Sequence, residues 1–331
     1  MQNKYTEAAE MLASAKKQFE ITGNQLEVVK CLRTLGEMYR MQNNYTEAVE
    51  VLIDAKQSEN IGSQQEAAEC LRSLGELCGM QNRYTEGAEM LTNAKIQYEN
   101  IGNKLGVAQC LQCLGDISLM QNRYTEAADL LTNAKNLSES IRDQWGAAES
   151  LKSLGQTHQM QGRYTEAAEM LEIAENQFED ISSKWGTAEC LRSLGEIHGM
   201  QGEHTEAAEM LTKAQNQFSE IGDQLGTTQC LRAFGQLYEM QNKYMEAIAM
   251  LNNAKIQFEN IEYQLGVAEC LKSLGQVYQM QNQHKKAAEM LNNAKNKFEN
   301  IGNELGATQC MQILDEIYNN PAEAAKSSIL G

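Results

Sequence analysis

Thiols could carry the most varied chemistry in this sequence, because a cysteine can be a nucleophile, a metal ligand or half of a disulfide. Seven of the nine cysteines recur at one position of a repeating pattern, where Ser150 is the exception. Stacked copies place equivalent atoms about 10 Å apart, whereas a disulfide needs Cα atoms within about 7 Å. We therefore expect reduced thiols that fill a core, and a reducing, cytoplasmic location. The seven are Cys31, Cys70, Cys110, Cys190, Cys230, Cys270 and Cys310.

Catalytic and metal-binding combinations are otherwise scarce. Cys113 lies outside the common cysteine position, and a reactive thiol is the alternative interpretation there. It follows Cys110 as C-x-x-C, but zinc sites of this type need a second pair. His158 and His198 replace the ring of Tyr39 at a packing position. No phosphate loop or nucleophile elbow interrupts the pattern. The sequence therefore predicts no enzyme, no cofactor and no metal.

Polar residues at three further positions lie one helical turn apart on a single face. The basic position holds Arg33, Arg72, Gln112, Lys152, Arg192, Arg232 and Lys272. The acidic position includes Glu37, Glu76, Asp116 and Glu196. A third position varies between copies and includes Arg40, Leu119, Gln159, Glu239 and Gln279. One interpretation is a solvated ladder of ion pairs within each helix, such as Arg33 with Glu37, each worth about 0.2–0.5 kcal/mol. The other is a basic ribbon that binds carboxylates or an acidic peptide.

The overall charge narrows the class of partner. The formal net charge is −17, from 45 Asp and Glu against 28 Lys and Arg. A protein that binds a phosphate backbone needs a basic face, and no apolar run approaches the roughly 18 residues of a membrane span. We therefore expect a protein or peptide partner, and neither nucleic acid nor membrane.

The elements that position these residues come from an internal repeat. Met-Gln-Asn or Met-Gln-Gly recurs every 40 residues, and once after 39. A fixed period of this length is typical of stacked repeats whose units cannot bury their apolar faces alone. We predict one continuous array of eight units over residues 1–319, followed by a tail at 320–331. The tripeptides begin at Met1, Met41, Met80, Met120, Met160, Met200, Met240 and Met280.

Each unit contains two amphipathic patterns with apolar residues three and four apart, which predicts a pair of helices. Asn or Gly follows the first pattern, as at Asn43, and Gly usually follows the second, as at Gly23. These residues tolerate the left-handed conformation that ends helices. We expect Thr46 and its equivalents to cap the second helix. An unpaired second helix (about 5–21), seven pairs and an unpaired first helix (about 305–318) follow from this register.

The residues at these packing positions resemble the tetratricopeptide repeat. Their types and spacings match that family in the order Leu32, Leu35, Gly36, Tyr39, Tyr45, Ala48, Leu52 and Ala55. The resemblance implies an all-α fold: a right-handed superhelical solenoid of antiparallel helix pairs, about 16 helices in all. It also implies that the first helices line a concave groove. The 40-residue period is similar to a longer-helix subclass, and the near-identity of the copies to arrays of fungal NLR-type proteins.

Two functions are compatible with this reading. The first is a non-catalytic scaffold, the sensor or scaffold part of a larger protein, which binds a protein or peptide, including acidic peptides, in its concave groove. The alternative is structural self-assembly, in which the unpaired helices at the two ends join copies head to tail. Trp145 and Trp185 replace a leucine of other copies, and we expect them to reinforce the core; a ligand cage is the alternative.

Overall fold

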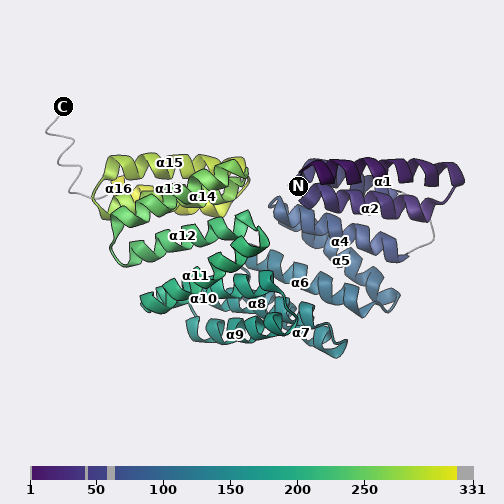
Figure 1. Cartoon of the computed structure of the whole chain (residues 1–331), viewed down its shortest axis with the longest axis horizontal. Coiled ribbons are helices and arrows are strands. Elements are labelled where there is room, and N and C mark those ends of the chain that lie inside the picture. The colour runs from purple at the N-terminus through teal and green to yellow at the C-terminus, as the bar shows by residue number, and fades with distance from the viewer. Residues whose placement is uncertain (1, 42–43, 58–63, 319–331) are drawn as a thin grey trace. The chain divides into compact units, whose positions relative to one another are not determined.

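The computed structural model of the chain describes residues 2–41, 44–57 and 64–318. These ranges contain 16 α-helices and no strand, and consecutive helices run back and forth (Figure 1). The predicted tail at 320–331 lies outside the described residues. None of the described helices is long and apolar enough to cross a membrane.

Two compact units make up the chain, residues 1–161 and 162–331. Unit 1 contains α1 (Gln2–Thr22), α2 (Gln25–Met41), α3 (Tyr45–Gln57), α4 (Gln64–Met80), α5 (Tyr84–Asn100), α6 (Lys104–Met120), α7 (Tyr124–Ser140) and α8 (Gln144–Met160). Unit 2 contains α9 (Tyr164–Asp180), α10 (Lys184–Met200), α11 (His204–Ile221), α12 (Gln224–Met240), α13 (Tyr244–Asn260), α14 (Gln264–Met280), α15 (His284–Asn300) and α16 (Glu304–Tyr318).

Even-numbered helices are the predicted first helices and odd-numbered helices the second ones. Within each unit, every even helix packs against the odd helix before it, and every even helix except α8 and α16 also packs against the odd helix after it and the next even helix. The predicted all-α, tetratricopeptide-like stack of antiparallel helix pairs is therefore confirmed in each unit. The single continuous array over 1–319 stays a prediction.

Close contact between a glycine and a leucine sets the distance between the helices of a pair. A Cβ added at Gly75 of α4 would lie 2.6 Å from Cγ of Leu91 in α5. The same atom at Gly195 of α10 would lie 2.8 Å from Cγ of Leu211 in α11. Real Cβ atoms essentially never come within 3.0 Å of a neighbour, so only glycine permits this approach. Both leucines are almost fully buried.

The turns confirm the expected left-handed residues and extend the set. Asn or Gly has positive φ at 82, 122, 162, 202, 242 and 282, as predicted, whereas Asn43 lies outside the described residues. The turns after second helices also have positive φ where glycine is missing: 60° at Arg142, 57° at Ser182 and 59° at Glu262. The fold therefore imposes the conformation even on side chains that disfavour it.

The expected cap of the second helices is wrong. In the pairs where a cap is described, the N-cap is the residue before the tyrosine or histidine, as at Arg83, and no side chain caps these helices. The threonine, Thr85 in this copy, already lies inside the helix. Side-chain caps occur instead on first helices, where Asp143 and Asp223 accept hydrogen bonds from the amides of Gly146 and Gly226 at 3.1 and 3.0 Å.

The seven cysteines at the common position of the repeat are buried, as expected for core thiols, and all nine cysteines are reduced. Burial raises the pKa of Cys110, Cys230 and Cys270 to about 12. These thiols therefore stay protonated at neutral pH and contribute by packing.

We predict that Glu262→Gly stabilises unit 2. A left-handed conformation costs a residue with a Cβ about 1–2 kcal/mol, and glycine avoids this cost at the expense of some entropy of the unfolded chain. The free energy of unfolding, measured by urea denaturation, is expected to rise by about 1 kcal/mol. Gly222→Glu, the reverse change in the preceding copy (φ 74°), is expected to lower it. An unchanged or reduced stability of Glu262→Gly would contradict the strain.

Candidate functional site

The charged positions predicted for a groove form a hydrogen-bonded network on the even helices of unit 1. Arg33 of α2 pairs with Glu69 of α4, and its Nε lies 3.5 Å from Oε2 of Glu66. Within α4, Arg72 pairs with Glu76. Lys152 of α8 donates to Oε1 of Glu149 at 2.6 Å. We call the surface formed by the basic, acidic and variable positions of the even helices the first-helix face.

Unit 2 repeats the arrangement around two arginines. Arg192 of α10 donates to Glu189 and Glu196 at 2.9 Å each. Arg232 of α12 lies 3.4 Å from a carboxylate oxygen of Glu269 in α14 and 4.0 Å from one of Glu196. Burial lowers the pKa of the Arg192 guanidinium, but Glu189 and Glu196 together raise it by more, so the net shift is upward. Arg192 is only 9% exposed.

Lys272 of α14 differs from the other cations of the basic position. Its Nζ donates to Oε1 of Gln309 in α16 at 2.8 Å and lies 5.9 Å from the centre of the Phe298 ring. In the described residues no ion pair joins it to a carboxylate, whereas each of the other five cations has at least one. An anionic ligand group could therefore approach Lys272 without displacing a carboxylate.

Small polar residues directly after the basic position connect successive even helices by hydrogen bonds. These hydrogen bonds were not predicted from the sequence. Ser73 of α4 donates to Oε1 of Glu37 in α2 at 2.9 Å. Cys113 of α6 donates to Oε1 of Glu76 in α4 at 3.4 Å. Gln112 of α6 donates to Oγ of Ser153 in α8 at 2.9 Å. A small polar residue recurs in the sequence directly after the basic position, and this recurrence could have indicated contacts between successive even helices.

The alternative of a reactive thiol at Cys113 is not supported. Burial raises the pKa of the Cys113 thiol well above its usual value, and the nearby carboxylates of Glu76 and Asp116 raise it further. A thiol that stays protonated at neutral pH is a poor nucleophile. Cys113 instead takes the place that serine occupies in neighbouring copies.

Two carboxyl groups of the predicted site have a raised pKa. Burial raises the pKa of Asp116 to about 6, and the negative charge of Glu149 adds to the effect. Hydrogen bonds from Ser153 and Gln112 act in the opposite direction. At the variable position, burial raises the pKa of Glu239 in α12 to about 7. Both groups therefore change charge near neutral pH.

The other variable-position residues are half-buried. Arg40 ends the first-helix face of α2 and bonds Glu37 at 2.7 Å. Leu119, Gln159 and Gln279 occupy the equivalent turn of α6, α8 and α14. Apart from the two glutamines, these residues differ in type, so this part of the face differs in chemistry from copy to copy.

Core reinforcement by the two tryptophans, expected from the sequence, is wrong. Trp145 of α8 is 50% exposed and Trp185 of α10 is 39% exposed. Each lies in the first turn of its helix, seven residues before Lys152 or Arg192, and two helical turns return a side chain to the same face. Three of the leucines at the equivalent positions are exposed too, Leu105 in unit 1 and Leu225 and Leu305 in unit 2, whereas Leu26 and Leu265 are partly buried. We call Leu105 and Trp145 the apolar row of unit 1, and Trp185, Leu225 and Leu305 the apolar row of unit 2.

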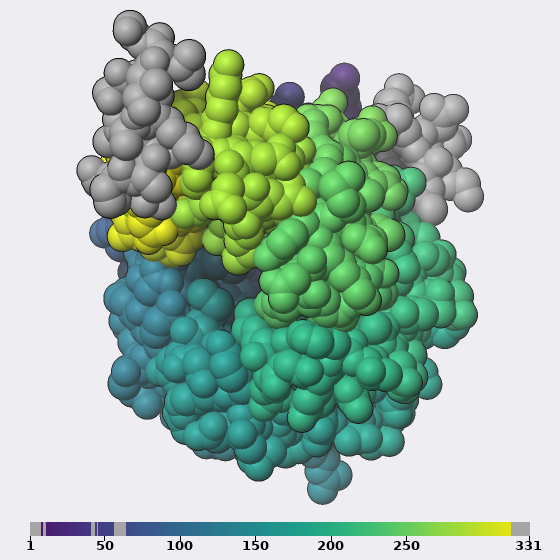
Figure 2. All heavy atoms as spheres, turned by 90° about the vertical axis from the view of Figure 1, so that its left-hand side faces the viewer, coloured from purple at the N-terminus to yellow at the C-terminus, as the bar shows by residue number. Residues whose placement is uncertain are grey.

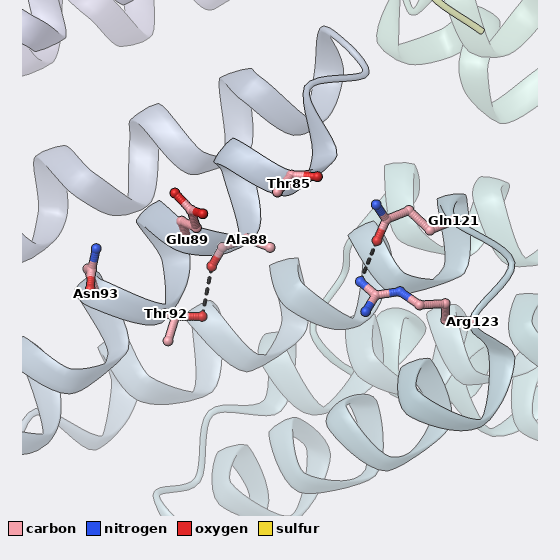
Figure 3. Close-up of a pocket in the computed structure, with 7 residues that line it drawn as sticks. All are labelled: Thr85, Ala88, Glu89, Thr92, Asn93, Gln121 and Arg123. Carbon is pink, nitrogen blue, oxygen red and sulfur yellow. Dashed lines mark hydrogen bonds between the residues drawn. The ribbon is translucent and has the colours of Figure 1, made fainter. Parts of the chain in front are cut away.

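A hollow on unit 1 lies elsewhere. Thr85, Ala88, Glu89, Thr92 and Asn93 of α5 line it, together with Gln121 and Arg123 from the turn between α6 and α7 (Figure 3). Thr92 bonds the carbonyl of Ala88 at 2.7 Å, and Arg123 pairs with Glu126 at 2.7 Å. None of the predicted groove residues lines this hollow.

Comparison with known proteins matches the sequence to the tetratricopeptide repeat. One profile of this repeat covers residues 108–180, 146–220, 186–254 and 231–299, and a second covers residues 28–58. No curated protein sequence matches the chain significantly. The 40-residue subclass and the likeness to fungal NLR-type arrays stay predictions.

Solved structures with a similar fold share little sequence with the chain. The Rap conjugation gene regulator of plasmid pLS20, in complex with the Phr* peptide, has a TM-score of 0.72 at 15% identity, over 85% of this chain and 76% of that one. A Rap protein complexed with Competence and Sporulation Factor gives 0.68 at 12% identity, over 97% of both chains. A signal transduction ATPase with a tetratricopeptide repeat sensor, from Pyrococcus horikoshii, gives 0.56 at 17%, over 86% of this chain and 46% of that one.

We predict that Asp116→Asn removes a pH-dependent destabilisation. The folded pKa of about 6 lies above the ordinary value of 3.8, so the native state binds more protons between these values. Stability should therefore fall as pH rises from about 4 to about 6 and then level off. At pH 7.5 the variant should be more stable by about 1–3 kcal/mol, and at pH 4 the two should be equal, by urea denaturation. Asp129→Asn on the exposed face of α7 is the control. Equal stability at pH 7.5 would contradict the burial argument.

Proposed function

The chain belongs to the tetratricopeptide repeat family, and we propose that it is a non-catalytic scaffold that binds a peptide segment of a partner along its first-helix face. The concave groove expected from the sequence is the proposed place of binding. The apolar row beside the charged positions is the observation that carries this proposal. It offers exposed rings and leucines where packing does not require them.

Binding energy in protein interfaces concentrates in a few buried anchors, of which tryptophan and arginine are the most frequent. The apolar row of each unit supplies one tryptophan, and the adjacent charged positions supply polar groups already held in place by neighbours. A peptide that covers Trp185 and Leu225 would bury apolar surface at about 25 cal/mol per Å². Glutamine amides at Gln229 and Gln236 of α12 lie on the same face and could bond its backbone.

The fold of the peptide-bound neighbours supports the same kind of partner. Two of the similar structures are complexes, one with the Phr* peptide and one with Competence and Sporulation Factor. At 12–15% identity their side chains do not transfer to this chain, so the proposal takes from them only the class of ligand.

The surroundings of Lys272 indicate which charge the bound peptide would carry. Five of the six cations at the basic position already pair with carboxylates, so an acidic peptide would have to displace those partners. Lys272 bonds only neutral groups in the described residues. We therefore propose that an acidic group of the peptide binds at Lys272 and that the rest of the peptide is apolar or neutral. The free carboxylate of a peptide end would serve equally.

A sensor role fits the comparison with the signal transduction ATPase, where a tetratricopeptide repeat sensor forms part of a longer chain. We propose the same role here: the repeat recognises a segment while another part of a larger protein responds. The buried, reduced cysteines favour a reducing, cytoplasmic location.

We predict that peptides with apolar anchors change the tryptophan fluorescence of the chain. The sequence has two tryptophans, one in the apolar row of each unit, so their emission reports on these two rows. Decapeptides with two leucines and otherwise serine, glutamate or lysine are suitable probes. A saturable shift with at least one class is expected, and no shift with any class at millimolar concentration would contradict the proposal.

Calorimetry on variants then locates the contact. Trp185→Ala should weaken the best peptide about tenfold or more, as loss of a hot-spot residue does. Ile256→Ala removes a side chain of similar exposure, 53%, from α13, and should leave the affinity unchanged. An equal effect of the two changes would show that the loss is not specific to the apolar row.

We predict that Lys272→Gln weakens the glutamate-containing peptide about three- to tenfold and leaves the serine-containing peptide unaffected, because one charge-assisted hydrogen bond is lost. Lys255→Gln on α13, which removes a half-buried lysine paired with Glu259 at 2.9 Å, is the matched control. If Lys255→Gln weakens the acidic peptide as much, the effect is one of overall charge and the assignment to Lys272 is wrong.

A further inference from the structure

The carboxylate of Glu239, in the last turn of α12, differs from the other carboxylates of α10, α12 and α14. The other three, on Glu189, Glu196 and Glu269, each lie within 3.4 Å of an arginine nitrogen. In the part of unit 2 that the structure describes, Glu239 accepts no hydrogen bond and forms no ion pair. Burial raises its pKa to about 7, from an ordinary value of 4.5. The charged form of Glu239 therefore lacks a compensating partner within the protein.

The neighbouring even helices bring no charge to this position. Its equivalents are Gly199 in α10 and Gln279 in α14. A Cβ built on Gly199 would meet its nearest neighbour, Leu237 of α12, at 3.4 Å, which is an ordinary contact, so a small group fits beside this end of α12. Lys243, the nearest cation along the chain, lies with its Nζ 5.8 Å from the centre of the Tyr238 ring instead.

The other charged and titratable groups around Glu239 are engaged elsewhere or too distant to affect it. Arg232, two turns earlier on α12, pairs with Glu269, and Glu203 pairs with His198. Burial is the cause of the raised pKa of Glu239, and no neighbouring charge contributes to it. The titratable groups at this end of the helices packed against α12 are His198, His204, Glu206, Tyr244, Glu246 and Tyr278.

The end of α12 is accessible to a ligand. Glu239 is half-buried, and atoms of residues 224–280, drawn in green, lie at the surface of unit 2 in Figure 2. We propose that Glu239 binds a lysine or arginine side chain of the peptide that lies along the first-helix face. The cationic group supplies the missing partner of the carboxylate, and a charge-assisted hydrogen bond is stronger at a half-buried site than in water.

This inference rests on the proposed function and changes the ligand in one respect. One of the residues outside the acidic group is basic, and the others stay apolar or neutral. With an acidic group at Lys272 of α14, the next even helix, the peptide then carries both charges. Neither charge displaces a carboxylate or a guanidinium that the fold already uses.

The test compares decapeptides that differ only in the charge of one side chain. Each has an acetylated amino end, two leucines and serine elsewhere, with lysine or acetyl-lysine at each serine position in turn. Acetyl-lysine keeps the stem and removes the charge. In calorimetry at pH 8, the best lysine peptide should bind wild type about five- to tenfold more tightly than its acetyl-lysine counterpart.

Two variants locate the effect. Glu239→Gln should bind the two peptides equally, and the fold tolerates glutamine there because α8 and α14 have Gln159 and Gln279 at this position. Glu246→Gln, which removes an exposed carboxylate from α13, is the matched control and should keep the preference of wild type. A preference for lysine that survives Glu239→Gln, or that Glu246→Gln abolishes equally, overturns the proposal.

The preference for lysine should also change with pH in a definite direction. The lysine stays charged from pH 6 to pH 8, whereas Glu239, with its pKa of about 7, changes from mostly protonated to mostly ionised. The preference of wild type should therefore grow several-fold over this range, and Glu239→Gln should show no such growth. A preference that is independent of pH in wild type would contradict the assignment.

A measurement without apolar peptides separates this proposal from the proposed function. In a chain with ¹³C-labelled glutamate, the carboxyl signal that disappears in Glu239→Gln reports the pKa of that group. About 5 mM trilysine should lower this pKa by more than that of exposed glutamates, because a bound cation favours the carboxylate. Equal shifts overturn the cation site, even if apolar peptides bind. The expected shift together with no binding of any apolar peptide supports the cation site and overturns the proposed function alone.

Discussion

The contact on which this structure depends is the approach of a leucine in each second helix to a glycine in the first. It fixes the separation of the two helices, as at Gly75 and Leu91, and each pair then presents its remaining apolar side to the next pair. Close-packed interiors tolerate changes of even one methylene poorly. The near-identity of the copies follows, because each copy has the same neighbours and therefore the same steric limits. At the glycine position of the even helices, only α16 departs, with Asp315.

The same regularity explains how the charged face contributes to stability. Successive even helices bring carboxylates of one copy beside the cations and hydroxyls of another, as Arg232 and Glu269 or Ser73 and Glu37 illustrate. These groups are partly buried, so their hydrogen bonds are stronger than those of solvated pairs. A solvated ladder describes them poorly, and so does a ribbon of available positive charge. The proposed ligand would meet a surface whose polar groups are already held in place by their neighbours, which would reduce the entropy lost on binding.

Much of the fold could be predicted from the sequence, because the features that specify it are local and repeated. The period, the helix pairs and the left-handed turn residues all follow from patterns within 40 residues, and eight copies remove most ambiguity. Contacts between copies were harder to predict. Arg33 was expected to pair along its own helix, and the structure joins it to Glu66 and Glu69 of the next even helix. The tryptophans were misplaced because a large apolar residue in the first turn of a helix can lie outside the core, and periodicity alone does not reveal this.

A face built from near-identical copies raises a problem for recognition that the exceptions can solve. A ligand on a uniform array could bind in several registers displaced by one copy, with nearly equal free energy, and specificity requires a difference between them. Single-copy departures supply that difference. The tryptophans occur in only two consecutive copies, and Lys272 faces Gln309 where Arg232 faces Glu269. Residues that break the repeat on this face are therefore the ones that can select a single position for a partner, while those that keep it maintain the scaffold.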